Sequence, residues 1–189
     1  MEQCSDNELI ARLRQGENPA LNEIMRRYKH RLYAFVLRYV HNEETAYDLV
    51  QETFTKLYFS ADKFNPQYKF STWLFQIALN LCRDYWRKNG REHHVSLDEE
   101  IGEDLVLGDT LASDAPPTDK VVDTKRQLAW VESEISRLPH KLKSALIAFA
   151  VEERSQEECA ELLGITPKTL ETRVYRARKI LTEKLSKKK

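Results

Sequence analysis

Glycine and proline are scarce in this chain, which has only five glycines and six prolines among 189 residues. Together they make up about 6% of the sequence, roughly half of their ordinary share of about 12%. Tight turns depend on these two residue types, so a turn-rich all-β fold is disfavoured. Cysteine is scarce too: Cys4, Cys82 and Cys159 are odd in number, widely spaced and outside any metal-binding pattern. A disulfide framework is therefore not expected, and we expect a reduced, cytoplasmic protein.

Long apolar runs, leader-like segments and common catalytic motifs are missing as well. No stretch approaches the ~20 apolar residues that a membrane-spanning helix needs, and the polar, acidic start of the chain does not resemble a secretory signal. The sequence contains no glycine-rich phosphate loop, nucleophile elbow or HExxH pattern. The adjacent His93 and His94 cannot share one helix face, which disfavours a metal site there. We therefore expect no catalytic residue, metal, cofactor or small-molecule substrate.

The 30 basic and 30 acidic residues cancel in number but are segregated along the chain. Residues 1–91 carry a net charge of +3, residues 92–125 of −8, and residues 126–189 of +5. The middle segment contains Pro116-Pro117 and no aromatic residue, so it cannot bury enough apolar surface to offset its ordering entropy. We therefore expect two small domains, 1–91 and 126–189, joined by a flexible acidic linker at 92–125.

Helical periodicity runs through the N-terminal segment, which favours an all-α fold. Ser5 and Glu8 match a capping box that opens a first helix. Further helices are expected over 18–39 and from 42 to about 57. A fourth helix, capped by Ser71 or Thr72, follows a loop at 62–70. Its expected inward residues are Trp73, Leu74, Ile77, Ala78, Leu81, Cys82 and Tyr85.

Two polar surfaces in this segment exceed what packing requires. On the third helix, Asp48, Gln51, Glu52 and Lys56 recur at spacings of three and four and so share a face; the alternative is an ordinary solvated face. In residues 64–91, aromatic side chains alternate with Arg and Lys. Exposed rings can stack unpaired bases for about 1–3 kcal/mol each while the cations hold phosphates. The alternative there is a tryptophan-rich core that ends in a solvated helix terminus.

The C-terminal segment contains the most specific pattern. Ser155 and Glu158 match a second capping box, Gly164 stands where a helix end favours a positive φ, and Thr166-Pro167 caps and starts another helix. Helix, glycine turn and helix form the helix-turn-helix layout. The apolar stripe expected on the second helix is Leu170, Val174, Ala177, Leu181 and Leu185. Its other faces present donors, acceptors and cations suited to a DNA major groove, and residues 165–189 carry a net +7. The alternative is a plain antiparallel helix pair.

Three stretches of the sequence resemble the extracytoplasmic-function (ECF) group of bacterial sigma factors, within the sigma-70 family. Residues 48–54, DLVQETF, are similar to the helix that binds RNA polymerase. Residues 70–80, FSTWLFQIALN, are similar to the segment that melts and reads the −10 promoter element. Residues 160–165, AELLGI, and 174–179, VYRARK, are similar to the helix-turn-helix that reads the −35 element. The resemblance covers nearly the whole chain apart from the linker.

The resemblance implies a promoter-specificity subunit with no catalytic residue of its own. It implies that the clamp helices of the polymerase β′ subunit dock on Asp48, Gln51, Glu52 and Lys56. It implies that the −10 element is handled by Phe64, Tyr68, Lys69, Asn80, Arg83, Arg87 and Lys88. It implies that the −35 element is read by Arg154, Lys168, Thr169, Glu171, Thr172, Arg173, Tyr175 and Arg176. The implied partners are core RNA polymerase (β′ clamp helices and β flap), promoter DNA and an anti-sigma factor that is often membrane-bound.

Glu171 departs from the pattern of the family, in which many members carry a basic or small residue at this position. An acid there repels phosphate but can accept a hydrogen bond from a cytosine amine. The sequence of the −35 element therefore stays open.

The separation of the two promoter elements constrains the linker. About twenty base pairs correspond to roughly 70 Å along the helix axis, whereas the segment 92–125 spans roughly 110 Å fully extended and about 30–35 Å as a free coil. The linker can therefore span the distance between the two promoter elements only if it is held in an extended form, for example in a basic channel of the polymerase. The competing interpretation is a free-standing helix-turn-helix regulator, which would bind its operator alone, normally as a dimer.

Overall fold

The computed structural model describes residues 4–89, 130–150 and 154–187 of the chain. All regular secondary structure in these three ranges is helical, which confirms the expected all-α fold. The helices are α1 (Asp6–Arg14), α2 (Asn18–Val40), α3 (Glu43–Ser60), the 3-10 turn η1 (Ala61–Lys63), α4 (Phe70–Asn89), α6 (His140–Ala150), α7 (Gln156–Leu163) and α8 (Pro167–Ser186). Residues 130–136 are helical too. The expected linker at 92–125 lies outside the described residues. No helix within the described ranges has the length and apolar character needed to cross a membrane.

Local capping signals set where the first helices begin. The Ser5 hydroxyl accepts from the Glu8 N–H at 3.3 Å, and the Glu8 carboxylate accepts from the Ser5 N–H at 2.6 Å, so the expected capping box is present. α2 ends at Val40, and the left-handed backbone of His41 (φ 56°) then turns the chain. Asn42 then caps α3, because its side-chain oxygen accepts from the Thr45 N–H at 2.8 Å.

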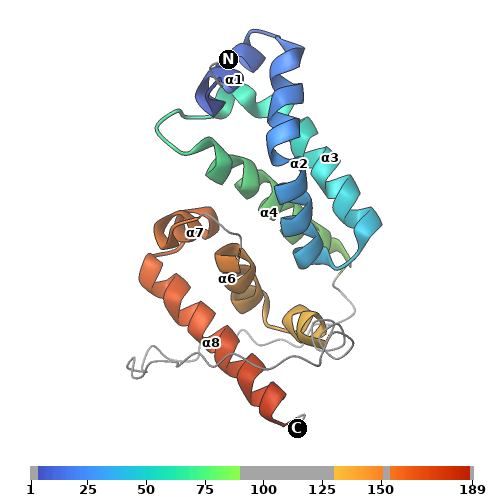
Figure 1. Ribbon diagram of the computed structural model, residues 1–189, viewed down its shortest axis with the longest axis vertical. Helices are drawn as coiled ribbons and strands as arrows, with labels where there is room; N and C mark the ends of the chain where they lie inside the picture. The colour runs from blue at the N-terminus through green and yellow to red at the C-terminus, as the bar shows by residue number, and fades with distance from the viewer. Residues whose placement is uncertain (1–3, 90–129, 151–153, 188–189) are drawn as a thin grey trace, which may run out of the picture.

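The N-terminal half is a helical bundle built around α2, which packs against α1, α3 and α4 (Figure 1). Its largest fully buried side chains include Ile24, Leu32, Phe35, Tyr39, Leu57 and Leu74. Phe35 of α2 meets Phe75 of α4 edge to face, with ring centroids 5.3 Å apart. Apolar burial, which stabilises by about 25 cal/mol per Å², is therefore shared among α2, α3 and α4.

The fourth helix begins earlier than its expected caps. α4 starts at Phe70, and the Lys69 carbonyl accepts from the Trp73 N–H at 3.2 Å, which places Ser71 and Thr72 inside the first turn. The prediction that one of them is the cap is therefore wrong. The physical reason is tertiary packing: Thr72 is only 3% exposed, so its side chain belongs to the interior and not to the helix end.

α4 is also buried around more of its circumference than expected. The buried members of the expected stripe are Leu74, Ala78, Leu81 and Cys82, whereas Trp73, Ile77 and Tyr85 are partly buried. Phe75 and Leu79, which lie outside that stripe, are buried as well. α4 packs on α2 and α3 and also on α7, so two of its faces are covered.

The C-terminal half forms the expected helix-turn-helix from α7 and α8, supported by α6. Gly164 ends α7 in the left-handed conformation (φ 68°). Its N–H bonds the Glu161 carbonyl at 3.1 Å while the Ile165 N–H bonds the Ala160 carbonyl at 3.0 Å, which is a Schellman termination. The Thr166 hydroxyl then accepts from the Thr169 N–H at 3.2 Å and caps α8.

Two details of this half differ from the sequence-based expectation. Ser155 caps α7 through the Glu158 N–H at 3.2 Å, but the Glu158 carboxylate does not return to Ser155 and instead pairs with Lys69 of the N-terminal half. Leu185 is 45% exposed and Leu181 is partly buried. At its C-terminal end α8 extends past α6 and α7, as Figure 1 shows, so neither of these helices covers the end of its apolar stripe, where Lys184 pairs with Glu134 of the helix 130–136.

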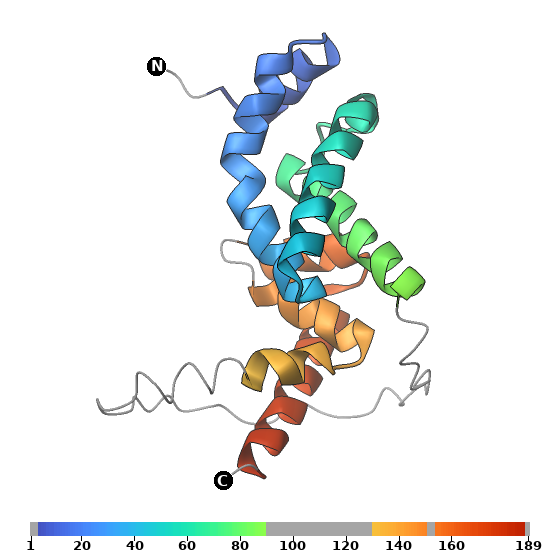
Figure 2. The ribbon, with the colours of Figure 1, turned by 90° about the vertical axis from the view of Figure 1, so that its right-hand side faces the viewer.

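The two halves contact each other directly, which the sequence did not predict. α7 packs on α4 and α6 packs on α2, and Figure 2 shows this contact from the side. Ile147, Ala148 and Leu162 of the C-terminal half belong to the same apolar cluster as the core of the N-terminal bundle. We call this surface, where α6 and α7 meet α2 and α4, the interdomain interface.

Candidate functional site

The α3 face singled out from the sequence is fully accessible. Asp48, Gln51, Glu52 and Lys56 are all exposed, while the apolar stripe of the same helix is buried in the bundle: Ala46, Leu49, Val50, Phe54 and Leu57. The Glu52 carboxylate and the Lys56 ammonium lie 3.4 Å apart, each half-exposed, so this ion pair adds little stability. The face can therefore be altered without removing an interaction on which the fold depends.

Three aromatic residues extend this face and were missed by the sequence analysis. Phe59 is 79% exposed and meets Tyr58 edge to face at 5.4 Å between ring centroids. Tyr47 is 47% exposed, and its hydroxyl accepts from the Gln51 side-chain amide at 3.0 Å. Their exposure could have been predicted from the sequence, because all three positions lie outside the apolar stripe of the helix. Exposed aromatic side chains are enriched where proteins bind one another, so this is the part of α3 best suited to a protein partner.

Phe64 does not have the role expected from the sequence. Its side chain is 3% exposed, and its ring centroid lies 5.7 Å from that of Phe70 and 5.2 Å from that of Trp73. Both ring faces are therefore covered by protein, and stacking on a base is not possible in this arrangement. The ring instead anchors the loop between α3 and α4 to the bundle.

The loop that follows Phe64 is exposed over 65–69 and presents two of the expected DNA-contacting residues. Tyr68 is 56% exposed, and Lys69 is exposed beside it. An open cavity of about 370 Å³ separates this loop from the start of α1. Its lining includes Ser5, Asp6 and Asn7 on one side and Gln67, Tyr68 and Lys69 on the other. No local pattern in the sequence indicates that the start of α1 lies opposite this loop.

The remaining expected −10 residues lie on α4, away from that cavity. Asn80, Arg87 and Lys88 are exposed and Arg83 is partly buried. With the exposed Gln76, which the sequence analysis did not single out, Asn80, Arg83 and Arg87 recur at spacings of four, three and four and share one helix face. Arg87 donates to the Asp84 carboxylate at 3.1 Å. The face offers amide donors and acceptors together with cations.

The expected −35 residues of α8 are accessible to different degrees. Lys168, Glu171 and Tyr175 are exposed, whereas Thr169, Thr172, Arg173 and Arg176 are partly buried. The Thr172 hydroxyl donates to the Lys168 carbonyl at 2.9 Å, and the Thr169 and Thr166 hydroxyls lie 2.9 Å apart. The hydroxyl groups of Thr169 and Thr172 can still accept a hydrogen bond from an incoming base edge.

Arg154 departs from the expected −35 set. Its guanidinium carbon lies 3.9 Å from the ring centroid of Phe75 on α4, and its two terminal nitrogens are buried with no hydrogen-bond partner among the described residues. Burial lowers the pKa of this guanidinium. Arg154 therefore belongs to the interdomain interface, and its assignment to the −35 surface is corrected. A cation stacked on an aromatic ring across two domains depends on their packing, which local pattern does not encode.

A second buried cation occupies the other end of this interface. The Lys143 ammonium lies 4.7 Å from the ring centroid of Trp86 and 5.6 Å from that of Tyr39, and the residue is 3% exposed. Burial lowers the pKa of Lys143 to about 8. The Tyr39 hydroxyl also contacts Ser144 and lies 2.9 Å from the His140 Nε2.

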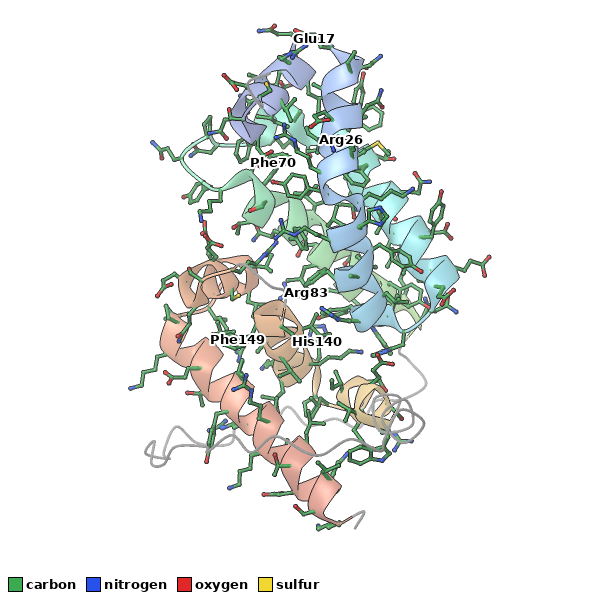
Figure 3. All side chains as sticks on the ribbon, viewed as in Figure 1. Glu17, Arg26, Phe70, Arg83, His140 and Phe149 are labelled. Carbon is green, nitrogen blue, oxygen red and sulfur yellow. The ribbon has the colours of Figure 1, made fainter. Side chains whose placement is uncertain are left out.

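His140 stands at the edge of this interface, and Figure 3 labels it together with Arg83 of α4. Desolvation, Arg83 and Lys143 together lower the pKa of His140. The polar residues His140, Lys143 and Ser144, spaced by three and four at the start of an apolar helix, were the signal in the sequence that this face is specialised. Within the described ranges, no group of three or more His, Cys, Asp or Glu side chains could hold a metal ion.

Comparisons with known families match both halves of the chain. The model of sigma-70 region 2 matches residues 24–92, and the model of sigma-70 region 4 matches residues 128–181. The ECF RNA polymerase sigma-E factor of Haemophilus influenzae is 30% identical over 97% of this chain and 97% of its own length. The ECF RNA polymerase sigma factor SigW of Bacillus subtilis is 30% identical over 93% of this chain and 94% of its own. Sigma-E of Escherichia coli is 31% identical over 97% and 96%, respectively.

Solved structures show the same helical arrangement. CnrH, in complex with the cytosolic domain of CnrY, matches 97% of this chain and 99% of its own with a TM-score of 0.70 and 25% identity. The sigma factor RpoE of Bartonella quintana, in complex with the anti-sigma factor NepR, shares the fold over 87% of this chain and 96% of its own with a TM-score of 0.61 and 24% identity. Two regions in the order of a sigma factor, and whole-length relatives of this kind, do not fit a free-standing regulator. The chain belongs to the ECF group of the sigma-70 family, the factors that direct bacterial RNA polymerase to its promoters.

Proposed function

We propose that this sigma factor divides its work among three surfaces: α3 docks the polymerase, the loop 65–69 and α4 engage the −10 element, and α8 reads the −35 element. The observation that carries the proposal is that the two matched regions keep the side chains of all three surfaces wholly or partly accessible while they bury the apolar faces of α3, α4 and α8. Polar exposed faces are ordinary on their own, and the match of both halves to sigma-70 regions 2 and 4 is what points to partners for these three.

The docking surface on α3 suits a protein partner that carries complementary charge. Asp48 and Glu52 offer carboxylates and Gln51 an amide, while Phe59 offers exposed apolar area. Charged side chains of this kind set orientation and association rate, and a buried aromatic residue supplies affinity. We assign this surface to the clamp helices of the polymerase β′ subunit.

The −10 surface suits DNA that has lost its base pairing. Tyr68 can stack on an unpaired base, and Lys69 can neutralise a phosphate. Asn80 can accept and donate to a base edge, while Arg83 and Arg87 on the same helix face hold the backbone. Phe64 is left out of this assignment because its ring is covered. The −35 surface is assigned to α8 from Lys168 to Arg176 without Arg154, with phosphates held by Lys168 and Arg173.

We call the arrangement in which the two halves meet at the interdomain interface the closed state. In this state the chain cannot engage both promoter elements at once. Lys69, from the −10 surface, pairs with Glu158 of α7, the helix that precedes the −35 reader. The two elements lie roughly 70 Å apart on the DNA. The interdomain interface must therefore open before both surfaces bind, and we assign that opening to core polymerase.

Anti-sigma binding is the second partner role that we propose. CnrH and the Bartonella RpoE were solved in complex with the cytosolic domain of CnrY and with the anti-sigma factor NepR, respectively. The agreement with CnrH extends over both regions, which supports a partner that holds this chain closed. Tethering of such a partner to the membrane would keep this sigma factor near the membrane until it is released.

Titration of labelled core polymerase with the full chain tests the docking assignment. Glu52→Lys should lower the affinity at least about tenfold, since charge reversal within an interface places like charges together. Glu161→Lys is the matched control because it makes the same charge change on an exposed residue of α7. Far-ultraviolet circular dichroism should give equal unfolding midpoints within the small range typical of surface changes. Equal core affinity of the wild type and Glu52→Lys would refute the assignment of α3.

A further inference from the structure

α1 lies before the region 2 match at 24–92, yet it holds the loop of the −10 surface. The Arg14 guanidinium donates from Nε to the Ala61 carbonyl at 3.0 Å. Its Nη2 donates to the Phe64 carbonyl and lies 3.5 Å from the Asp62 carbonyl. A single side chain of α1 thus binds the carbonyl groups of the turn that connects α3 to the loop.

Phe64 is consequently fixed twice. Its carbonyl is held by Arg14 from outside, and its ring is held from inside by Phe70 and Trp73. The exposed segment 65–69 begins directly after this point. The direction in which Tyr68 and Lys69 leave the bundle is therefore set at Phe64.

α1 itself is firmly attached to the bundle. The Asp6 carboxylate pairs with Arg27 of α2 at 3.0 Å and accepts from the Tyr28 hydroxyl. Leu9, Ile10 and Leu13 of α1 are buried. A guanidinium carried on such a helix holds its position, which a side chain on a fraying terminus would not.

The start of α1 also faces the loop across the open cavity of about 370 Å³. Asn7 lies on the α1 side and Tyr68 on the loop side. An amide and an exposed aromatic ring on opposite sides of a cavity fit a flat, polar, unpaired base, which stacks on one and bonds to the other.

We propose that Arg14 is a positioning residue for −10 recognition: it holds the loop 65–69 in place opposite α1, so that an unpaired base is received between them. This inference rests on the assignment of that loop to the −10 element. Arg14 acts through the loop backbone and does not touch the base.

Arginine suits this role because of its geometry. The planar guanidinium presents five N–H donors in a fixed fork, so it can bond several carbonyl groups in one plane. A lysine at the same position keeps the charge but offers a single ammonium on a flexible stem. The two residues are therefore distinguishable by experiment.

The test uses the full chain bound to core polymerase and a fluorescent single-stranded oligonucleotide that carries a −10 sequence. Arg14→Ala and Arg14→Lys should each weaken oligonucleotide binding by about tenfold or more, as expected for the loss of charge-assisted hydrogen bonds. Affinity for core polymerase should stay unchanged, because α3 is untouched. Arg12→Ala is the matched control, since Arg12 lies on the same helix, pairs with Glu17 on the surface and makes none of the described hydrogen bonds to the loop.

Each other outcome has a defined meaning. Wild-type oligonucleotide affinity in Arg14→Ala would overturn the inference, as would an equal loss of core affinity, which indicates general destabilisation. Wild-type oligonucleotide affinity in Arg14→Lys would also overturn the inference, because a positive charge alone would then be enough to position the loop. Tyr68→Ala distinguishes a failure of the Arg14 inference from a failure of the loop assignment. If Tyr68→Ala weakens oligonucleotide binding while Arg14→Ala does not, only the inference about Arg14 fails. If neither variant weakens binding, the assignment of the loop 65–69 to the −10 element fails too.

Discussion

Lys143 opposes closure of the two halves, and its replacement by methionine should strengthen the closed state. The ammonium is buried at the interdomain interface against Trp86 and Tyr39, both from the N-terminal half. A pKa of about 8 in place of 10.5 corresponds to about 3 kcal/mol at about 1.4 kcal/mol per pKa unit. The ring contacts return about 0.5–2 kcal/mol of this. Lys143→Met, which keeps the volume, should therefore favour closure by about 1–3 kcal/mol near neutral pH.

The sign of the pH dependence follows from the lowered pKa. A buried lysine whose pKa falls destabilises the closed state while it is protonated, so the cost is fully present below pH 8 and fades as the pH rises toward 10.5. The lowered pKa of His140 acts in the same sense, because protonation at acid pH again opposes closure. Arg83 of α4 adds positive charge on the facing side and strengthens the effect on His140. The closed fraction of the wild type should rise with pH.

Single-pair fluorescence energy transfer between labels on α1 and on the end of α8 would measure the closed fraction. We expect Lys143→Met to raise it at pH 7 and to flatten its rise between pH 7 and 9. Lys141→Met is the control, since it removes an exposed lysine from the same helix. A closed fraction that is unchanged in Lys143→Met, or that falls as the pH rises in the wild type, would refute the reasoning.

Two further predictions concern single residues. Gly164→Ala should lower the free energy of unfolding of the C-terminal half by about 1–2 kcal/mol in urea titrations, because its φ of 68° is strained for any residue with a Cβ although no atom obstructs that Cβ; an unchanged midpoint would contradict this account. Asn80→Ala should reduce permanganate reactivity of −10 thymines in the open complex while leaving the closed complex intact, since an unpaired base is needed for the contact. Wild-type reactivity would show that Asn80 is an ordinary solvated residue.

Signals confined to a few neighbouring residues were predicted well from the sequence. The Ser5 capping box, the left-handed Gly164 and the Thr166 cap each depend on contacts within five residues. The family resemblance added the order of the two regions. The three helix caps are local, so the sequence encodes them independently of the tertiary structure.

The errors concern residues whose environment is set by tertiary packing and not by helix periodicity. Phe64 carries the composition of a stacking platform but is covered by Phe70 and Trp73. Arg154 follows the pattern of a DNA contact but stacks on Phe75 of the other half. The extra buried face of α4 arises because α7 packs on this helix in addition to α2 and α3. A pattern that gives helix phase cannot tell how many of its faces will be covered.

Glu158 illustrates a competition built into the interdomain interface. Its carboxylate pairs with Lys69, and the Ser155 N–H, which a capping box would use, lacks that carboxylate as its acceptor. When the halves separate, the same carboxylate can turn back by one helical turn and complete the box at the start of α7. Breaking the ion pair therefore exchanges one interaction for another, and opening costs less than the closed contacts alone would indicate. If α8 reads the −35 element as proposed, α7 would be better capped in the open state that binds DNA.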